Sequence, residues 1–251
     1  MLKVIKVILF TLLYLSLKFN NLPKFYTTQA SSSIITLGEN DSRHAIKSLR
    51  LRVSDKMDVI DGKGNSFITK IVDDNPKKTT AKILKKVTYK ADIPLHLAFC
   101  PTKSNAKNEL IVEKAVEIGA TTISPIFSQN SERRQWNSKR MEKIVIAAIK
   151  QSQRYWLPEV KEHSTFSEFI DSAEEIQHNL IAHCKEGKKT PLSKLVDRTK
   201  AQLILIGPEG DFTENEITLA LQNNFKAVEL GINRLRTETA CMVALALMKN
   251  N

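Results

Sequence analysis

Residues 203–213, Leu-Ile-Leu-Ile-Gly-Pro-Glu-Gly-Asp-Phe-Thr, decide the fold of the second part of this chain. The four apolar residues predict an inner strand of a parallel sheet, because a strand buried on both faces lacks polar alternation. Thr213 and Glu216 then match a capping box, which predicts a helix from Glu214 to about Asn223. Similar strand patterns at 95–99, 122–126, 180–183 and 226–230 alternate with helical patterns at 108–118, 139–153 and 239–248. This alternation predicts an α/β domain with a parallel sheet over residues 91–251.

The preceding part of the chain has a different pattern. Four short segments rich in β-branched residues lie between residues 33 and 87, and Asp61-Gly62-Lys63-Gly64-Asn65 is typical of a hairpin turn. A stretch with helical spacing, 41–51, interrupts them. We therefore expect a small β-barrel over residues 21–90 and a domain boundary near residue 90.

Residues 1–20 form an apolar N-terminal extension. Lys3 and Lys6 precede an apolar run from Val7 to Leu17, which is the layout of a targeting signal. The run is short for a bilayer span, and a clear cleavage site is missing. A targeting segment, a membrane-surface anchor and a spurious translation start all remain open, and membrane contact is expected only if these residues are retained.

The chain is strongly basic, with a formal net charge of +11. The extension contributes three lysines and no acidic residue, so +8 remains without it. Such a charge favours a polyanionic partner such as nucleic acid or an anionic membrane.

Cys100, Cys184 and Cys241 lie far apart, without a CxxC pair. Neither a disulfide framework nor a metal site is expected. Each cysteine lies among apolar residues and is expected to be a small buried hydrophobe.

Two loops could carry chemistry. Gly207-Pro208-Glu209-Gly210 follows a predicted strand, and ligands of open α/β sheets bind at the carboxyl ends of strands. An ordinary strand-to-helix connection would also favour glycine and proline. Neither G-x-G-x-x-G nor a P-loop is present here, so phosphate cradling is not indicated.

The second loop, residues 230–240, concentrates Arg234, Arg236 and Glu238 between apolar flanks. An internal Arg–Glu ion pair is one interpretation. The other is that a remaining guanidinium meets an anionic substrate, because it offers a rigid fork of donors.

These two loops, in this order, resemble the signature loops of the RsmE-type ribosomal RNA uridine N3-methyltransferases of the SPOUT superfamily. The resemblance runs from about Leu22 to the C-terminus and departs from the family at Gln129-Asn130 and Lys47, which affects RNA contacts rather than the cofactor site. Further matches are His44 with Leu49-Arg50-Leu51, Asp61-Gly62-Lys63-Gly64, Pro101-Thr102-Lys103, Glu113-Lys114-Ala115 with Glu117-Ile118-Gly119, and Gln151-Ser152.

The resemblance implies a PUA-like N-terminal β-barrel for RNA and a C-terminal SPOUT α/β domain with a deep trefoil knot. It further implies S-adenosyl-L-methionine as cofactor, N3 methylation of a uridine in 16S (small-subunit) ribosomal RNA, a homodimer, and a cytoplasmic location, or an organelle if residues 1–20 are a targeting segment. A non-catalytic RNA-binding protein and a ribose 2′-O-methyltransferase are the alternatives.

Roles for individual residues are a hypothesis that rests on their placement on two loops expected to converge beside the cofactor. Arg236 is expected to donate to the uracil oxygens, and Glu238 or Glu209 to orient it or accept the proton. The RNA-binding set is Arg43, Lys47, Arg50, Arg52 and Lys103. A solvated helix face is the alternative for each of the first four. The cofactor-binding set is Leu205, Ile206, Gly207, Pro208, Glu209, Gly210, Leu230, Gly231, Arg234, Leu235 and Arg236.

Overall fold

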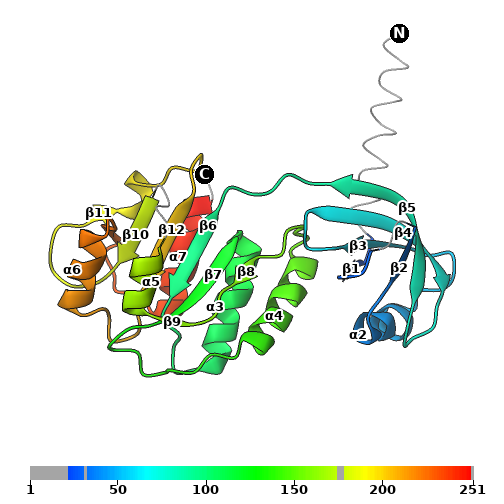
Figure 1. Ribbon diagram of the computed structural model, residues 1–251, viewed down its shortest axis with the longest axis horizontal. Helices are drawn as coiled ribbons and strands as arrows, with labels where there is room; N and C mark the ends of the chain where they lie inside the picture. The colour runs from blue at the N-terminus through cyan, green and yellow to red at the C-terminus, as the bar shows by residue number, and fades with distance from the viewer. Residues whose placement is uncertain (1–21, 31–32, 174–177, 250–251) are drawn as a thin grey trace, which may run out of the picture. The chain divides into compact units, whose positions relative to one another are not determined.

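The computed structural model describes residues 22–30, 33–173 and 178–249, and the chain divides between Lys90 and Ala91 into two compact units (Figure 1). The predicted roles of residues 1–20 lie outside the described residues. Among the described residues, no helix has the length and apolar character needed to cross a bilayer.

The N-terminal unit is built on a five-stranded sheet in the order β1-β3-β4-β5-β2. Its pairs are antiparallel except β1 with β3. One face buries a cluster that includes Phe25, Ile35, Met57 and Ile71. The strands are β1 (Lys24–Tyr26), β2 (Ile34–Thr36), β3 (Lys56–Ile60), β4 (Asn65–Asp73) and β5 (Thr80–Thr88).

The helical stretch predicted for 41–51 begins earlier and ends sooner. It consists of α2 (Glu39–Arg43) followed by a π-helical turn, η1 (His44–Ser48). Ser42 fixes it to the sheet, because its buried hydroxyl donates to Leu37 O and accepts from Thr79 N. The helix stops where Arg50 adopts a left-handed backbone with φ of 58°.

The C-terminal unit contains a parallel sheet in the order β11-β13-β10-β12-β6-β7-β8, with β9 paired to β7. The predicted α/β class is confirmed, and β12 lies in the middle of the sheet. The strands are β6 (Leu95–Phe99), β7 (Thr122–Phe127), β8 (Glu159–Val160), β9 (Ser164–Thr165), β10 (His178–Ala182), β11 (Thr190–Pro191), β12 (Gln202–Ile206) and β13 (Lys226–Glu229). The helices are α3 (Asn105–Ile118), α4 (Ser138–Gln151), α5 (Phe166–Ser172), a 3-10 turn η2 (Leu192–Lys194), α6 (Glu214–Gln222) and α7 (Thr237–Lys249).

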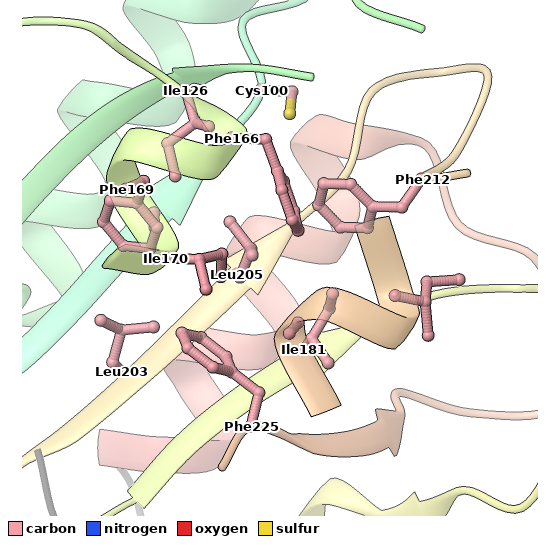
Figure 2. Close-up of a cluster of buried hydrophobic side chains, with 13 residues drawn as sticks. Cys100, Ile126, Phe166, Phe169, Ile170, Ile181, Leu203, Leu205, Phe212 and Phe225 are labelled. Atoms are coloured by element: carbon pink, nitrogen blue, oxygen red, sulfur yellow. The ribbon is translucent and has the colours of Figure 1, made fainter. Parts of the chain in front are cut away.

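Helices cover both faces of this sheet. Leu203 and Leu205 of β12 join Phe166 of α5 and the loop residue Phe212 in one buried cluster (Figure 2). Because side chains alternate along a strand, Ile204 and Ile206 face the other side, where α7 contacts β12 and β6. The deep trefoil knot stays a prediction.

The capping box predicted at Thr213 is confirmed. The Thr213 hydroxyl accepts from Glu216 N at 3.3 Å, and the Glu216 carboxylate accepts from Thr213 N at 2.9 Å. This fixes the start of α6 and hence the end of the loop that leaves β12.

Candidate functional site

A cavity of about 640 Å³ opens at the carboxyl ends of β10, β12 and β13. Three loops enclose it: the loop after β10, which we call the first loop (183–189), the second loop (207–213) and the third loop (230–236). The lining residues are Ala182, His183, Cys184, Lys189, Ile206, Gly207, Pro208, Glu209, Asp211, Val228, Glu229, Leu230, Gly231, Ile232, Asn233, Arg234, Leu235, Arg236, Thr237 and Ala240.

The second loop is held at its start, Gly207. A Cβ on Gly207 would lie 3.1 Å from the buried Phe212 ring, so this close approach favours glycine. The Gly207 carbonyl accepts from the Thr237 hydroxyl at 3.2 Å, which ties the loop to the start of α7.

Asp211 joins the first loop to the second. Its backbone is left-handed, with φ of 63°, and its side chain is buried. One carboxylate oxygen accepts from Cys184 N at 2.7 Å and the other from Phe212 N at 2.8 Å. Hydrogen bonds to a charged acceptor are stronger than neutral ones, so this carboxylate fixes two walls of the cavity.

A segment after β7 supports the second loop from outside the cavity. The Asn130 amide donates to Gly210 O at 3.3 Å and to Asp211 O at 3.0 Å. The neighbouring Gln129 N donates to the Glu216 carboxylate at 2.8 Å. Of the positions at which the sequence departs from the RsmE-type pattern, Asn130 therefore contacts the second loop, and Gln129 contacts α6 through its backbone N–H. Our expectation that this departure concerns RNA contacts did not include these contacts.

The third loop is tied to the second through Arg234, whose guanidinium donates to Glu209 O at 3.2 Å. Gly231 has φ of 154°, and its position is open. At the rim, Ile232 is fully exposed. Glu209 and Arg236 are also exposed.

Glu238 lies outside the lining and pairs with Lys107 of α3 at 3.0 Å. Burial alone would raise the pKa of the Glu238 carboxyl, but its own backbone N–H, Lys107 and Arg236 outweigh burial and lower it. The carboxylate therefore stays ionised near Arg236, which suits an orienting group better than a proton acceptor.

His183 lines the first loop and is half-buried. Burial, assisted by the Lys189 charge, lowers the pKa of its imidazole, so the ring is neutral at neutral pH. The Lys189 ammonium is held by the carbonyls of Lys185 and His183 at 2.5 and 3.5 Å.

The structure brings most predicted cofactor-binding residues together. Leu205 and Gly210 are exceptions: the Leu205 side chain belongs to the buried core, and Gly210 lies against Asn130. The first loop, Asp211 and Thr237 were not predicted as part of the site. The prediction that Cys184 is buried was wrong, because Cys184 is exposed and lines the cavity, whereas Cys100 and Cys241 are buried as expected.

The predicted RNA-binding residues fall on both units. Arg43, Lys47, Arg50 and Arg52 are exposed on the N-terminal unit, and the Arg43 guanidinium pairs with Glu39 at 2.7 Å. Lys103 is exposed on the C-terminal unit, 3.5 Å from Glu132. Residues 22–90 hold fourteen Lys and Arg against seven Asp and Glu, a net +7, whereas residues 91–251 hold twenty-one against twenty, a net +1. The basic character therefore resides in the N-terminal unit.

Both the basic β unit and the α/β unit with its three-loop cavity match known protein families. The model of an RNA methyltransferase domain matches residues 89–249, and that of an RNA methyltransferase PUA domain matches residues 37–84. The chain belongs to this family of RNA methyltransferases, which confirms the resemblance noted from the sequence.

Individual relatives cover nearly the whole chain. It is 30% identical to the ribosomal RNA small subunit methyltransferase E of Rickettsia conorii, over 88% of this chain and 91% of the relative. It is 31% identical to the Synechocystis protein of the same name, over 87% and 73% respectively.

Two solved structures are similar. A probable rRNA-methyltransferase from Porphyromonas gingivalis superposes with a TM-score of 0.84 at 32% identity, over 89% of this chain and 95% of that one. The Neisseria gonorrhoeae ribosomal RNA small subunit methyltransferase E, bound to S-adenosyl methionine, gives 0.81 at 29% identity, over 91% and 97%.

Proposed function

We propose that this chain transfers a methyl group from S-adenosyl-L-methionine to N3 of a uridine in 16S (small-subunit) ribosomal RNA. The observation that carries this proposal is the cavity formed by three loops that hydrogen bonds join to one another. Arg236 is part of its lining. The names of the relatives support the ribosomal substrate, and the cofactor in the Neisseria gonorrhoeae structure supports the choice of methyl donor.

The cavity suits this cofactor. Its volume lies within the range of small-molecule sites. Its lining presents backbone groups of three loops, the carboxylates of Glu209 and Glu229, and the cations of Lys189 and Arg234. Such a mixed lining fits a zwitterionic nucleoside with a positive sulfonium. When bound, the cofactor supplies an electrophilic methyl group.

The chain's own residues would act on the uracil. N3 carries a proton in the neutral base, so methyl transfer requires that this proton be removed and that charge on the carbonyl oxygens be stabilised. Arg236, which is in the cavity lining, would donate to those oxygens, and Glu238, held by Lys107, would orient it. The exposed Glu209 at the rim is our candidate for accepting the proton.

The N-terminal unit would hold the RNA. N3 lies on the Watson–Crick edge, so the target uridine must be unpaired when it enters the site. Lys47, Arg50 and Arg52 would contact phosphates, joined by Arg43 if RNA displaces Glu39, and by Lys103 of the C-terminal unit. We further propose that the protein acts as a cytoplasmic homodimer.

The test is methyl transfer from S-adenosyl-L-methionine to unmodified small-subunit RNA, followed by mass spectrometry of the digested product. We expect N3-methyluridine. Arg236→Ala should lower kcat by about 100-fold, as removal of an oxyanion donor does, with little change in cofactor affinity. Arg236→Lys, which keeps the charge but loses the fork, should be intermediate. A ribose-methylated product, or unchanged kcat in Arg236→Ala, would contradict the proposal.

A further inference from the structure

Three lysines lie side by side across the sheet of the N-terminal unit. Lys56 of β3 is in register with Lys70 of β4, and Lys70 is in register with Lys82 of β5. Ile34 of β2 continues the row as the register partner of Lys82. All four side chains are exposed. We call this set the lysine row.

The row lies on the face of the sheet opposite the core. Met57, Ile71 and Ala81, each next in sequence to one of the lysines, belong to the buried cluster. Because successive side chains of a strand point to opposite faces, the lysines point away from it. The α2–η1 helix lies on the core side, since its Ala45 and Ile46 belong to the same cluster. The row therefore lies on a different face of the unit from Arg43 and Lys47, the predicted RNA contacts on that helix.

Ordinary reasons for lysine in a sheet do not explain the row. Lysine commonly protects edge strands from pairing with other chains, but β3, β4 and β5 are the three inner strands of this sheet. Like charges directly opposite one another on neighbouring strands are destabilising. No ion pair links Lys70 or Lys82 to a carboxylate in the part of the chain that the structure describes. The nearby Asp55 and Asp73 accept instead from backbone N–H groups.

The surroundings of the row favour nucleic acid as its partner. Exposed apolar side chains accompany the lysines: Ile34 in the row, Val72 two residues beyond Lys70, and Leu84 two residues beyond Lys82. A single RNA strand offers phosphates to lysines and apolar base faces to such side chains. The net +7 of this unit adds long-range attraction for a polyanion.

We propose that the lysine row is a second RNA-contact surface, on which Lys70 and Lys82 bind phosphates of the ribosomal RNA. Arg43 and Lys47 of the α2–η1 helix are predicted to contact RNA on the core side of the sheet. The RNA would then be held by two faces of the unit. This inference rests on the proposed function, because it assumes that RNA is the substrate.

The test is the salt dependence of binding of a fluorescent single-stranded oligoribonucleotide of small-subunit sequence. Wild type is compared with Lys70→Gln/Lys82→Gln and with a control, Lys77→Gln/Lys78→Gln. The control removes the same charge from the exposed turn between β4 and β5. The row variant should reduce the slope of log affinity against log salt by about 1.4, at about 0.7 for each phosphate contact, and the control should leave it close to wild type.

Thermal unfolding separates lost contacts from lost structure. Because the row variant removes like-charge repulsion, its Tm should equal or exceed that of wild type. Equal slopes for wild type and the row variant, or equal reductions in row variant and control, would overturn the inference and leave the methyl-transfer proposal intact. Failure of wild type to bind the RNA would overturn both.

Discussion

Replacing Asp211 by glycine removes the side chain that links the first loop to the second but keeps the left-handed backbone of the second loop. The Asp211 carboxylate accepts Cys184 N at 2.7 Å and Phe212 N at 2.8 Å, and both bonds disappear in Asp211→Gly. The left-handed backbone, with φ of 63°, is one that glycine adopts without strain. The variant should therefore fold, with the first loop no longer fixed to the second.

The magnitude follows from these contacts. A hydrogen bond to a charged group contributes about 1.5–3 kcal/mol. The greater freedom of glycine in the unfolded chain costs about 0.4–1 kcal/mol, and relief of the left-handed strain offsets it in part. Without the hydrogen bond to Cys184, the cofactor must itself order the first loop when it binds. The loss of this bond should therefore weaken cofactor binding by about tenfold or more, since 1.4 kcal/mol corresponds to tenfold.

Calorimetric titration with S-adenosyl-L-methionine measures this effect. Asn224→Gly is the matched control, because Asn224 has φ of 65°, is exposed and lies outside the cavity lining. It should bind the cofactor like wild type. Asp211→Asn, which keeps one acceptor, should be intermediate. A folded Asp211→Gly protein with cofactor affinity within about twofold of wild type would refute the reasoning.

Two more predictions follow from single side chains. Asn130→Ala removes two donors to the carbonyls of Gly210 and Asp211 and should weaken cofactor binding several-fold in the same calorimetric assay, with a smaller effect on kcat; unchanged affinity would show that the support is dispensable. Burial, aided by Lys161, lowers the pKa of His96 to about 4. Below about pH 6.5 the unfolded chain therefore binds a proton at this histidine, whereas the folded chain binds it only near pH 4. The contribution of neutral His96 to the free energy of unfolding is therefore fully present above about pH 6.5 and is lost as the pH falls toward 4, by up to about 3 kcal/mol. In denaturant titrations, His96→Gln should flatten this pH dependence.

The second and third loops could be predicted because their determinants are local in sequence. The Thr213 capping box and the apolar run of β12 mark the second loop on either side. The helix α5 was missed although Thr165 and Glu168 form the same kind of capping box, because the pattern that follows is only seven residues long. The alternation along β12 points the Leu205 side chain into the core, so only its backbone remains as a predicted cofactor contact.

Other features depend on pairings that a single sequence does not specify. The first loop enters the site because β10 lies between β12 and β13, and the strand order cannot be read from the apolar runs. The Asn130 contact likewise requires the β7 end to reach the second loop. The lysine row exists only through the register of β3, β4 and β5, since its members lie far apart in the sequence.

Hydrogen exchange of the backbone amides, with and without S-adenosyl-L-methionine, tests the central claim most directly. If the three loops enclose the cofactor, it should slow exchange at residues 183–189, 207–213 and 230–236 together, while β3 to β5 of the N-terminal unit exchange as before. Exchange that is unchanged at all three loops, or slowed only in other segments, would contradict the account.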